Sequence, residues 1–410
     1  MNVTANAKTE RIISLDVIRG FAILGILLMN IQSFSMIGQA YLNPMAYGDM
    51  TGLNKWVWIL SHTLADQKFM SIFSMLFGAS IIMITQNQER KTGQSFSAHY
   101  RRNFWLLIIG LIHAYLFWYG DILAPYAVCA FLLYPLRKLS VRMLLVWGVI
   151  IFTIGSLIET LAGLELLNTP QEVLQQKMGG WRPHQRIVEM EVNAYLGSFP
   201  EQMEQRTKTA VMMHTETFLS HYLWRISGLM LIGMALFKSG FLTNTRKPKL
   251  YKQILAWSGA AGLSLVVVGI IKNFEAYWAI EYAKFLNAQF NYWGSLLMSV
   301  AYISGVILLI QYGLVSWLTN LLSCVGRTAL SNYLMQTLIC TFIFYGFGLG
   351  LFGQVERTGQ LMIVIGIWVF QVLASWLWLK CFSYGPFEWL WRSLSNWKVQ
   401  PLCKQAKPYS

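Results

Sequence analysis

The side chains of this sequence that could perform chemistry are a few ionisable and amide groups set in apolar surroundings. His113 follows the pair Arg101-Arg102 by about three helical turns and precedes Gly120-Asp121. Because histidine titrates near neutral pH, it is a natural general base for a hydroxyl or an amine. A hydrogen-bonding role in the core is the alternative. His113 and Asp121 are too far apart along one straight helix to touch, unless the chain bends at Gly120.

A second group of polar residues opens the first apolar run. Asp16 and Arg19 have the i, i+3 spacing of a helical ion pair, and Asp16 suits the first turn of a helix. Arg19 is a candidate to hold an anionic group such as a phosphate, whereas a positively charged helix anchor is the simpler interpretation. Asn30 lies near the same face and about 16 Å deeper, either as a pore-lining donor or as an interhelical hydrogen-bonding residue.

A third group precedes the second apolar run, where Asp66 and Lys68 are close in sequence and His62 lies just before them. An ionisable group inside a membrane is costly unless it is paired or hydrated, so each is a functional candidate. Metal chemistry is not expected, since the five cysteines and six histidines show no metal-binding spacing. A phosphate-binding P-loop is also missing from the sequence, which argues against an ATPase.

The amino-acid composition indicates what surroundings these groups have in the folded protein. Of 410 residues, 55% are hydrophobic and 12% are charged, whereas soluble proteins carry about 25% charged residues. Apolar runs of about 20 residues, long enough to cross a bilayer, recur along the chain. We therefore expect an all-α, polytopic transmembrane helical bundle in which residues 1–410 form one membrane domain surrounded by lipid. The net charge of +14 lies in scattered short clusters, which argues against a nucleic-acid partner.

The pattern predicts about ten spans. They fall at 20–37, 69–86, 103–119, 122–136, 143–162, 218–237, 253–271, 292–313, 328–349 and 360–379. Most of the 32 Lys and Arg residues then lie in loops on one side, which places both termini in the cytoplasm. An extracytoplasmic loop at about 163–217 contains an amphipathic segment, 185–196, and is a linker or a substrate lid, with the linker slightly favoured. A cytoplasmic tail covers about 380–410.

Several segments together resemble the DUF418 family of bacterial membrane proteins, and the resemblance covers nearly the whole chain. The matching segments are 15–31, 68–78, 110–123, 325–336 and 384–392. That family is similar to a wider set of transmembrane acyltransferases, which includes the lysosomal heparan-α-glucosaminide N-acetyltransferase and the acyltransferase-3 proteins. The resemblance implies transfer of an acyl group from cytoplasmic acyl-CoA, such as acetyl-CoA, to an extracytoplasmic glycan or lipid. It also implies a location in the bacterial cytoplasmic (inner) membrane.

The resemblance to the lysosomal enzyme is carried by two motifs. The matching residues are Asp16, Arg19, Gly20 and Asn30, followed by Asp66, Phe69 and Gly78. This chain departs from the pattern at Tyr41, where the lysosomal enzyme has an active-site histidine. The base must therefore come from elsewhere, with His113 as the first candidate and His62 or Asp121 next.

Two functions are left open by the sequence. In the first, the chain is an acyl-CoA-dependent transferase. Its catalytic candidates are His113, Asp121, Asn30 and Asp66. Its CoA-binding candidates, at the cytoplasmic mouth of the bundle, are Asp16, Arg19, Arg101, Arg102, Arg327 and Asn332. Ser331 and Asn332 would also line the path through the bundle. In the second, a transporter or permease for a small solute, Asp16 and Arg19 form a gate and His113 and Asp121 a proton relay. A structural role is a weaker third interpretation, and assembly into a homo-oligomer is undecided.

Overall fold

The computed structural model describes residues 12–404, with the side chains of 171 and 175–178 left out, and confirms the all-α fold. Within that range the extended pairing is a single bridge between Phe382 and Cys403. The helices of the bundle are α1 (Ile13–Ser35), α4 (Lys68–Thr92), α5 (Phe96–Ile112), α6 (Leu123–Leu133), α7 (Val141–Leu167), α11 (Leu223–Lys238), α12 (Pro248–Glu275), α13 (Ala288–Tyr312), α15 (Ala329–Phe344) and α16 (Arg357–Cys381).

Each of the ten predicted spans coincides with one of these bundle helices. Within residues 12–404, six helical segments are long and apolar enough to cross a membrane: 13–35, 52–92, 141–167, 248–275, 281–312 and 357–381. Helix α15 is shorter but also apolar. The chain is therefore a helical membrane protein, while the count of ten spans and its orientation remain predictions.

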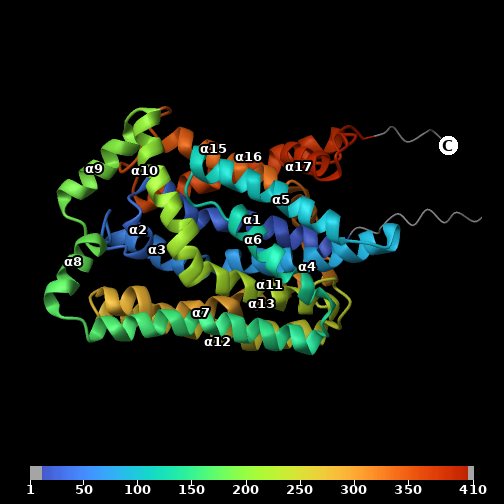
Figure 1. Cartoon of the computed structure of the whole chain (residues 1–410), viewed down its shortest axis with the longest axis horizontal. Coiled ribbons are helices and arrows are strands. Elements are labelled where there is room, and N and C mark those ends of the chain that lie inside the picture. The colour runs from blue at the N-terminus through green and yellow to red at the C-terminus, as the bar shows by residue number, and fades with distance from the viewer. Residues whose placement is uncertain (1–11, 405–410) are drawn as a thin grey trace, which may run out of the picture.

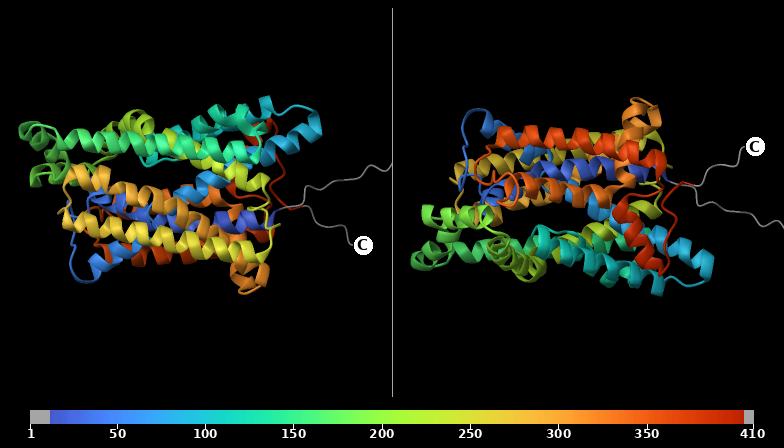
Figure 2. Two further views of the ribbon diagram at one scale, coloured as in Figure 1. Left: turned by 90° about the horizontal axis from the view of Figure 1, so that it is seen from below. Right: turned by 90° about the horizontal axis from the view of Figure 1, so that it is seen from above.

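The bundle helices run side by side along the long axis of the molecule (Figure 1). The starts of α1 and α5 and the helix α17 (Pro386–Asn396) lie at one end, which we call the basic end because it carries Arg102 and Arg392. The opposite, far end carries α2 (Gln39–Leu42), α3 (Gly52–Leu64), α8 (Gln171–Trp181), α9 (Gln185–Leu196) and α10 (Phe199–Met212). Two further views show the same lengthwise arrangement (Figure 2).

Glycines allow the central helices to touch backbone to backbone. A Cβ atom at Gly78 of α4 would lie 1.9 Å from the carbonyl oxygen of Met230, and one at Gly233 of α11 would lie 1.9 Å from that of Met75. Small residues at such crossings are typical of membrane helices, which lack a hydrophobic force to bring them together. Gly78 of the second motif therefore has a packing role.

Close packing at glycines also joins α1 to α14 (Ser316–Arg327). Helix α14 is amphipathic and lies in a segment that we predicted only as an apolar loop. A Cβ atom at Gly20 would overlap the carbonyl oxygen of Leu322, and one at Gly326 would overlap that of Asp16. The first motif and the segment around Arg327, which are far apart in sequence, thus meet at the basic end.

The polar segment that follows α7 is folded into α8, α9 and α10, and α9 confirms the amphipathic helix predicted at 185–196. These helices are tied to the bundle by hydrogen bonds. Glu191 accepts the backbone N–H of Gly38 at 2.9 Å, and Arg206 donates to the carbonyl oxygen of Leu116. Whether this segment acts as a linker or a lid remains a prediction.

We expect Gly233→Val to destabilise the protein, because the new side chain must push α11 away from α4. Overpacking typically costs about 1–3 kcal/mol, and a clash with backbone belongs at the upper end of that range. Gly366→Val on α16 is the matched control, since a Cβ atom there meets nothing within 4 Å. Thermal unfolding in detergent should show a lower Tm for the first variant than for the second. Equal Tm values would contradict the packing role.

A buried histidine–aspartate pair and an arginine cluster

A break in the helix places His113 next to Asp121. After Ile112 the α-helix becomes one π-helical turn, η1 (His113–Phe117), and Trp118 is extended with φ −158° and ψ 126°. In a straight helix these two residues would be about 12 Å apart along the axis. The π turn and the extended residue reverse the chain before α6, so the bend begins earlier than Gly120. Single π turns inside helices are rare and are frequent at functional sites.

Three hydrogen bonds fix the pair. Nδ1 of His113 lies 2.9 Å from Oδ1 of Asp121, and Oδ2 of Asp121 accepts the backbone N–H of Ala124 at 2.7 Å. Nε2 of His113 lies 2.9 Å from Oγ1 of Thr337 on α15. Because a carboxylate can only accept, Nδ1 carries a proton, and in the neutral imidazole Nε2 is then the acceptor of the threonine hydroxyl. This is the orientation that a general base needs.

Aromatic rings enclose this site. The ring of Tyr333 lies 5.1 Å from that of His113, and the Trp118 ring lies 6.3 Å away. A second histidine, His214, comes close from the π-helical turn η3 (Met213–Tyr222), where its ring lies 5.7 Å from that of Tyr115. Burial lowers the pKa of His214, and the charge of Asp121 opposes that shift. His113 itself is 2% exposed, so the pair is sealed from solvent.

Asp66 belongs to a separate group of polar residues, which we call the Asp66 cluster: Tyr41, His62, Asp66, Lys68 and Asn291. Tyr41 and Asn291 donate hydrogen bonds to Asp66 at 2.9 and 2.7 Å, and Nδ1 of His62 lies 3.3 Å away. Lys68 donates to the other side of Asn291, at 2.6 Å from Oδ1. One asparagine therefore bridges a carboxylate and an ammonium group that are both buried. Tyr41, the position at which the resemblance to the lysosomal enzyme would lead one to expect a histidine, contacts this aspartate.

A buried arginine near the Asp66 cluster escaped the sequence analysis. Arg225 of α11 is fully buried, donates to the hydroxyls of Ser71 and Ser295, and lies 4.5 Å from the centre of the Tyr292 ring. A charge in the middle of the predicted span 218–237 was the signal that could have identified it. Asn291 and Thr337 gave no such signal, because amides and hydroxyls are common in membrane helices.

The basic end gathers three arginines. Arg19 pairs with Asp16 at 3.2 Å, and the guanidinium of Arg102 stacks on Trp391 at 3.6 Å from the ring centre. Burial, together with the positive charges of Arg392 and Arg19, lowers the pKa of Arg102 to about 9. We call Arg19, Arg102 and Arg392 the arginine cluster. Arg392 was not among the predicted site residues, since it lies in the tail segment where the helix α17 was not expected.

The remaining candidates have other partners. Arg101 donates to the carbonyl oxygen of Ser395, and Arg327 lies 3.5 Å from that of Ser383. The amide of Asn332 donates to the hydroxyls of Thr328 and Ser375, both at 2.9 Å, and so joins α15 to α16. In the described part of the chain, no hydrogen bond links the half-buried Asn30 to the other candidates.

Ser331, which was predicted to line a path, is held by α17. Its hydroxyl donates to Glu388, which also accepts the backbone N–H groups of Leu330 at 2.6 Å and of Ser331 at 3.2 Å. The carboxylate thus caps the start of α15, where a negative charge is favourable. Burial raises the pKa of Glu388, and these hydrogen bonds oppose the shift.

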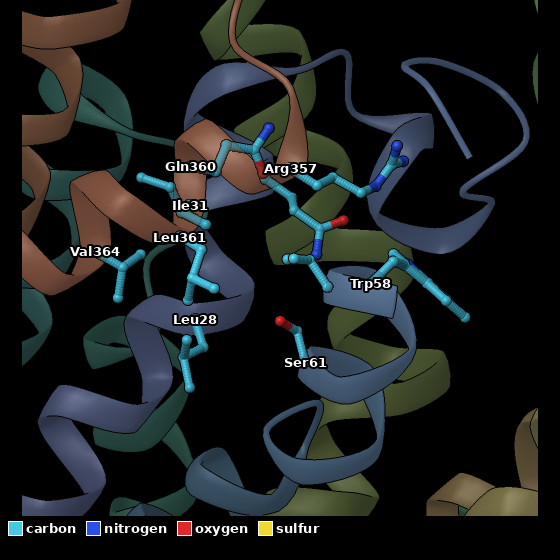
Figure 3. Close-up of a pocket in the computed structure, with 10 residues that line it drawn as sticks. Leu28, Ile31, Trp58, Ser61, Arg357, Gln360, Leu361 and Val364 are labelled. Atoms are coloured by element: carbon cyan, nitrogen blue, oxygen red, sulfur yellow. The ribbon is translucent and has the colours of Figure 1, made fainter. Parts of the chain in front are cut away.

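A small pocket lies between α1, α3 and α16 (Figure 3). Apolar residues such as Leu28 and Val364 line it, together with Ser61. The Arg357 guanidinium extends away from the pocket and donates to the carbonyl oxygens of Asp49, Pro44 and Tyr47. Arg357 therefore anchors the loop after α2. The pocket residue Trp58 stacks on His62, with ring centres 4.9 Å apart, so the pocket adjoins the Asp66 cluster.

Together these features define a helical membrane protein with a buried histidine–aspartate pair and a cluster of arginines at one end. The chain belongs to the DUF418 family, as predicted. The family model described as "Protein of unknown function (DUF418)" matches residues 236–398. The uncharacterized protein YeiB of Escherichia coli (strain K12) is 33% identical over 393 residues, which are 94% of this chain and 96% of YeiB. The uncharacterized protein YxaH of Bacillus subtilis (strain 168) is 32% identical over 425 residues, 97% of each chain.

Replacing the bridging asparagine should test how the Asp66 cluster is held together. We expect Asn291→Leu to lower the free energy of unfolding by about 3 kcal/mol, because it leaves a buried carboxylate and a buried ammonium without their shared partner. Asn273→Leu on α12 is the control, since Asn273 is buried to a similar extent, at 6% against 5% exposed. Unfolding followed by tryptophan fluorescence measures both. A smaller loss in Asn291→Leu than in the control would rule out the bridging role.

Proposed function

We propose that this protein is an acyltransferase of the bacterial cytoplasmic membrane. It would take an acyl group from cytoplasmic acyl-CoA and place it on a hydroxyl or amine of an extracytoplasmic glycan or lipid. The observation that carries this proposal is the hydrogen-bonded line from Asp121 through His113 to the hydroxyl of Thr337. A base oriented by a carboxylate and facing a hydroxyl is the arrangement that acyl transfer uses on several unrelated folds.

His113 is the general base of the proposed reaction. Its Nε2 accepts the proton of the attacking hydroxyl, and Asp121 holds the ring in the required tautomer and stabilises the imidazolium that forms. The low dielectric of the buried site strengthens this interaction, because water does not screen the two charges. The same base then returns the proton to the departing thiolate of CoA.

The arginine cluster is the proposed binding site for the phosphates of CoA. Arginine binds phosphate through paired N–H groups, and three positive charges close together favour a polyanion. Arg102 and His113 lie on one continuous helical segment, eleven residues and about 16 Å apart. A CoA bound at the basic end has to extend its thioester arm over this distance to reach His113. The motif residues Asp16 and Arg19 take part at the same end through their ion pair.

Transport of a small solute is the second candidate function, and the Asp66 cluster favours it. Buried ionisable groups inside a membrane bundle are typical of proton relays. Asp66, Lys68 and Arg225 have no part in the acyl-transfer route proposed here. A transporter would use these groups, and it would not cleave a thioester.

Release of CoA from acetyl-CoA by the purified protein in lipid nanodiscs tests the proposed function. We expect His113→Gln and Asp121→Asn to lower the rate of CoA release by about 10²–10⁴-fold, because both remove general-base catalysis. Binding of acetyl-CoA, measured by titration calorimetry, should be retained in both variants. CoA release that is unchanged in both variants would remove His113 as the base.

Substitution of one arginine tests the phosphate site separately. We expect Arg102→Gln to weaken the binding of acetyl-CoA by about tenfold or more, since a charge-assisted hydrogen bond contributes about 1.5–3 kcal/mol. Arg90→Gln, at the exposed end of α4, is the matched control and should bind as the wild type does. If wild-type protein neither binds acetyl-CoA nor releases CoA, the transferase proposal fails and transport becomes the better explanation.

A further inference from the structure

We propose that Thr337 is the nucleophile of this reaction and carries the acyl group as an ester on its Oγ1. This inference rests on the proposed function. It adds a covalent intermediate, so that acyl transfer takes place in two steps. The carboxylate of Asp121 would then orient the base, His113 would be the base, and Thr337 would be the nucleophile.

The Thr337 hydroxyl differs in direction from many buried hydroxyls of this bundle. Buried hydroxyls on the helices of this bundle commonly donate to the carbonyl oxygen four residues earlier, as Ser71, Thr85 and Thr341 do at 2.7, 2.7 and 2.8 Å. That local bond satisfies a polar group without help from another helix. The Thr337 hydroxyl instead points to Nε2 of His113, 2.9 Å away.

The hydrogen bond at the other ring nitrogen of His113 determines which group donates in this contact. Nδ1 donates to Asp121, so in the neutral imidazole Nε2 has a free lone pair and Thr337 is the donor. A hydroxyl that donates to an imidazole is prepared to lose its proton. An interhelical hydrogen bond with no chemical role would hold α15 against η1 equally well in either direction, and it would not need the buried carboxylate behind the ring.

The proposed steps balance as follows. Oγ1 of Thr337 attacks the carbonyl carbon of the thioester while Nε2 of His113 takes the hydroxyl proton. The C–S bond breaks, and the CoA thiolate leaves with the proton from His113 as free CoA. A hydroxyl or amine of the acceptor then attacks the threonyl ester, with His113 again as the base. The C–O bond to Oγ1 breaks, Thr337 regains its proton, and no oxidant or reductant is needed.

Isotope exchange without an acceptor distinguishes this route from direct transfer. A covalent acyl-enzyme forms reversibly, so labelled free CoA should enter unlabelled acetyl-CoA when no acceptor is present. We expect this exchange in wild-type protein and in Thr341→Ala, which alters a hydroxyl one turn away on the same helix. Exchange should fall more than about a hundredfold in Thr337→Ala and in His113→Gln. Thr337→Ser should keep it, because serine offers the same nucleophile.

Mass spectrometry of acid-quenched protein should locate one added acetyl group in the peptide that contains Thr337. Exchange in Thr337→Ala, or an acetyl group on a different residue, would overturn the inference. Turnover with an acceptor but without exchange would also overturn it, while leaving His113 as the base of a direct transfer. Loss of acetyl-CoA binding and CoA release in the wild type would instead refute the proposed function. Comparable Tm values for Thr337→Ala and Thr341→Ala would show that lost exchange is not a folding defect.

Discussion

The lack of polar partners in lipid is the constraint on which this structure depends. A charged or polar side chain inside a membrane bundle must find its partner within the protein, because hydrocarbon offers none. Asp66 and Lys68 meet this demand through Asn291, and Nη2 of Arg225 does so through two serine hydroxyls. His113 does so through Asp121 and Thr337. Apart from the contact between His113 and Asp121, these contacts join segments that are distant in sequence, so the polar groups also determine which helices are neighbours.

Close packing of helices at glycines also determines how the helices are arranged. Gly20 and Gly326 let α1 and α14 touch, and this contact brings Asp16 and Arg19 to the same region as Arg327. Some of the segments that resemble the DUF418 family, such as these, place a glycine beside a charged residue. The charged residues of those segments therefore need the glycines to reach their positions.

The sequence predicted those features that depend on local pattern. Apolar runs located all ten bundle helices, and amphipathic periodicity located α9. Helices α14 and α17 were missed, because short amphipathic helices lack a long apolar run. The contact between His113 and Asp121 could not be derived from the sequence, because it depends on a π turn that no residue pattern indicates. The role of Thr337 required the tertiary structure, because its partner is 224 positions away in sequence.

Stability alone gives a poor account of the histidine–aspartate pair. Replacing a buried polar or charged pair by well-packed apolar residues is often neutral or even stabilising. A fold that needed only to hold α5 to α15 could do so with leucines, as much of this bundle does. His113 and Asp121 instead require a π turn, an extended Trp118 and a backbone N–H from α6 to satisfy them. This local arrangement is the one that the proposed proton transfer would require, and under the same proposal Arg102, at the start of that helical segment, would help to supply the charge that a CoA substrate needs.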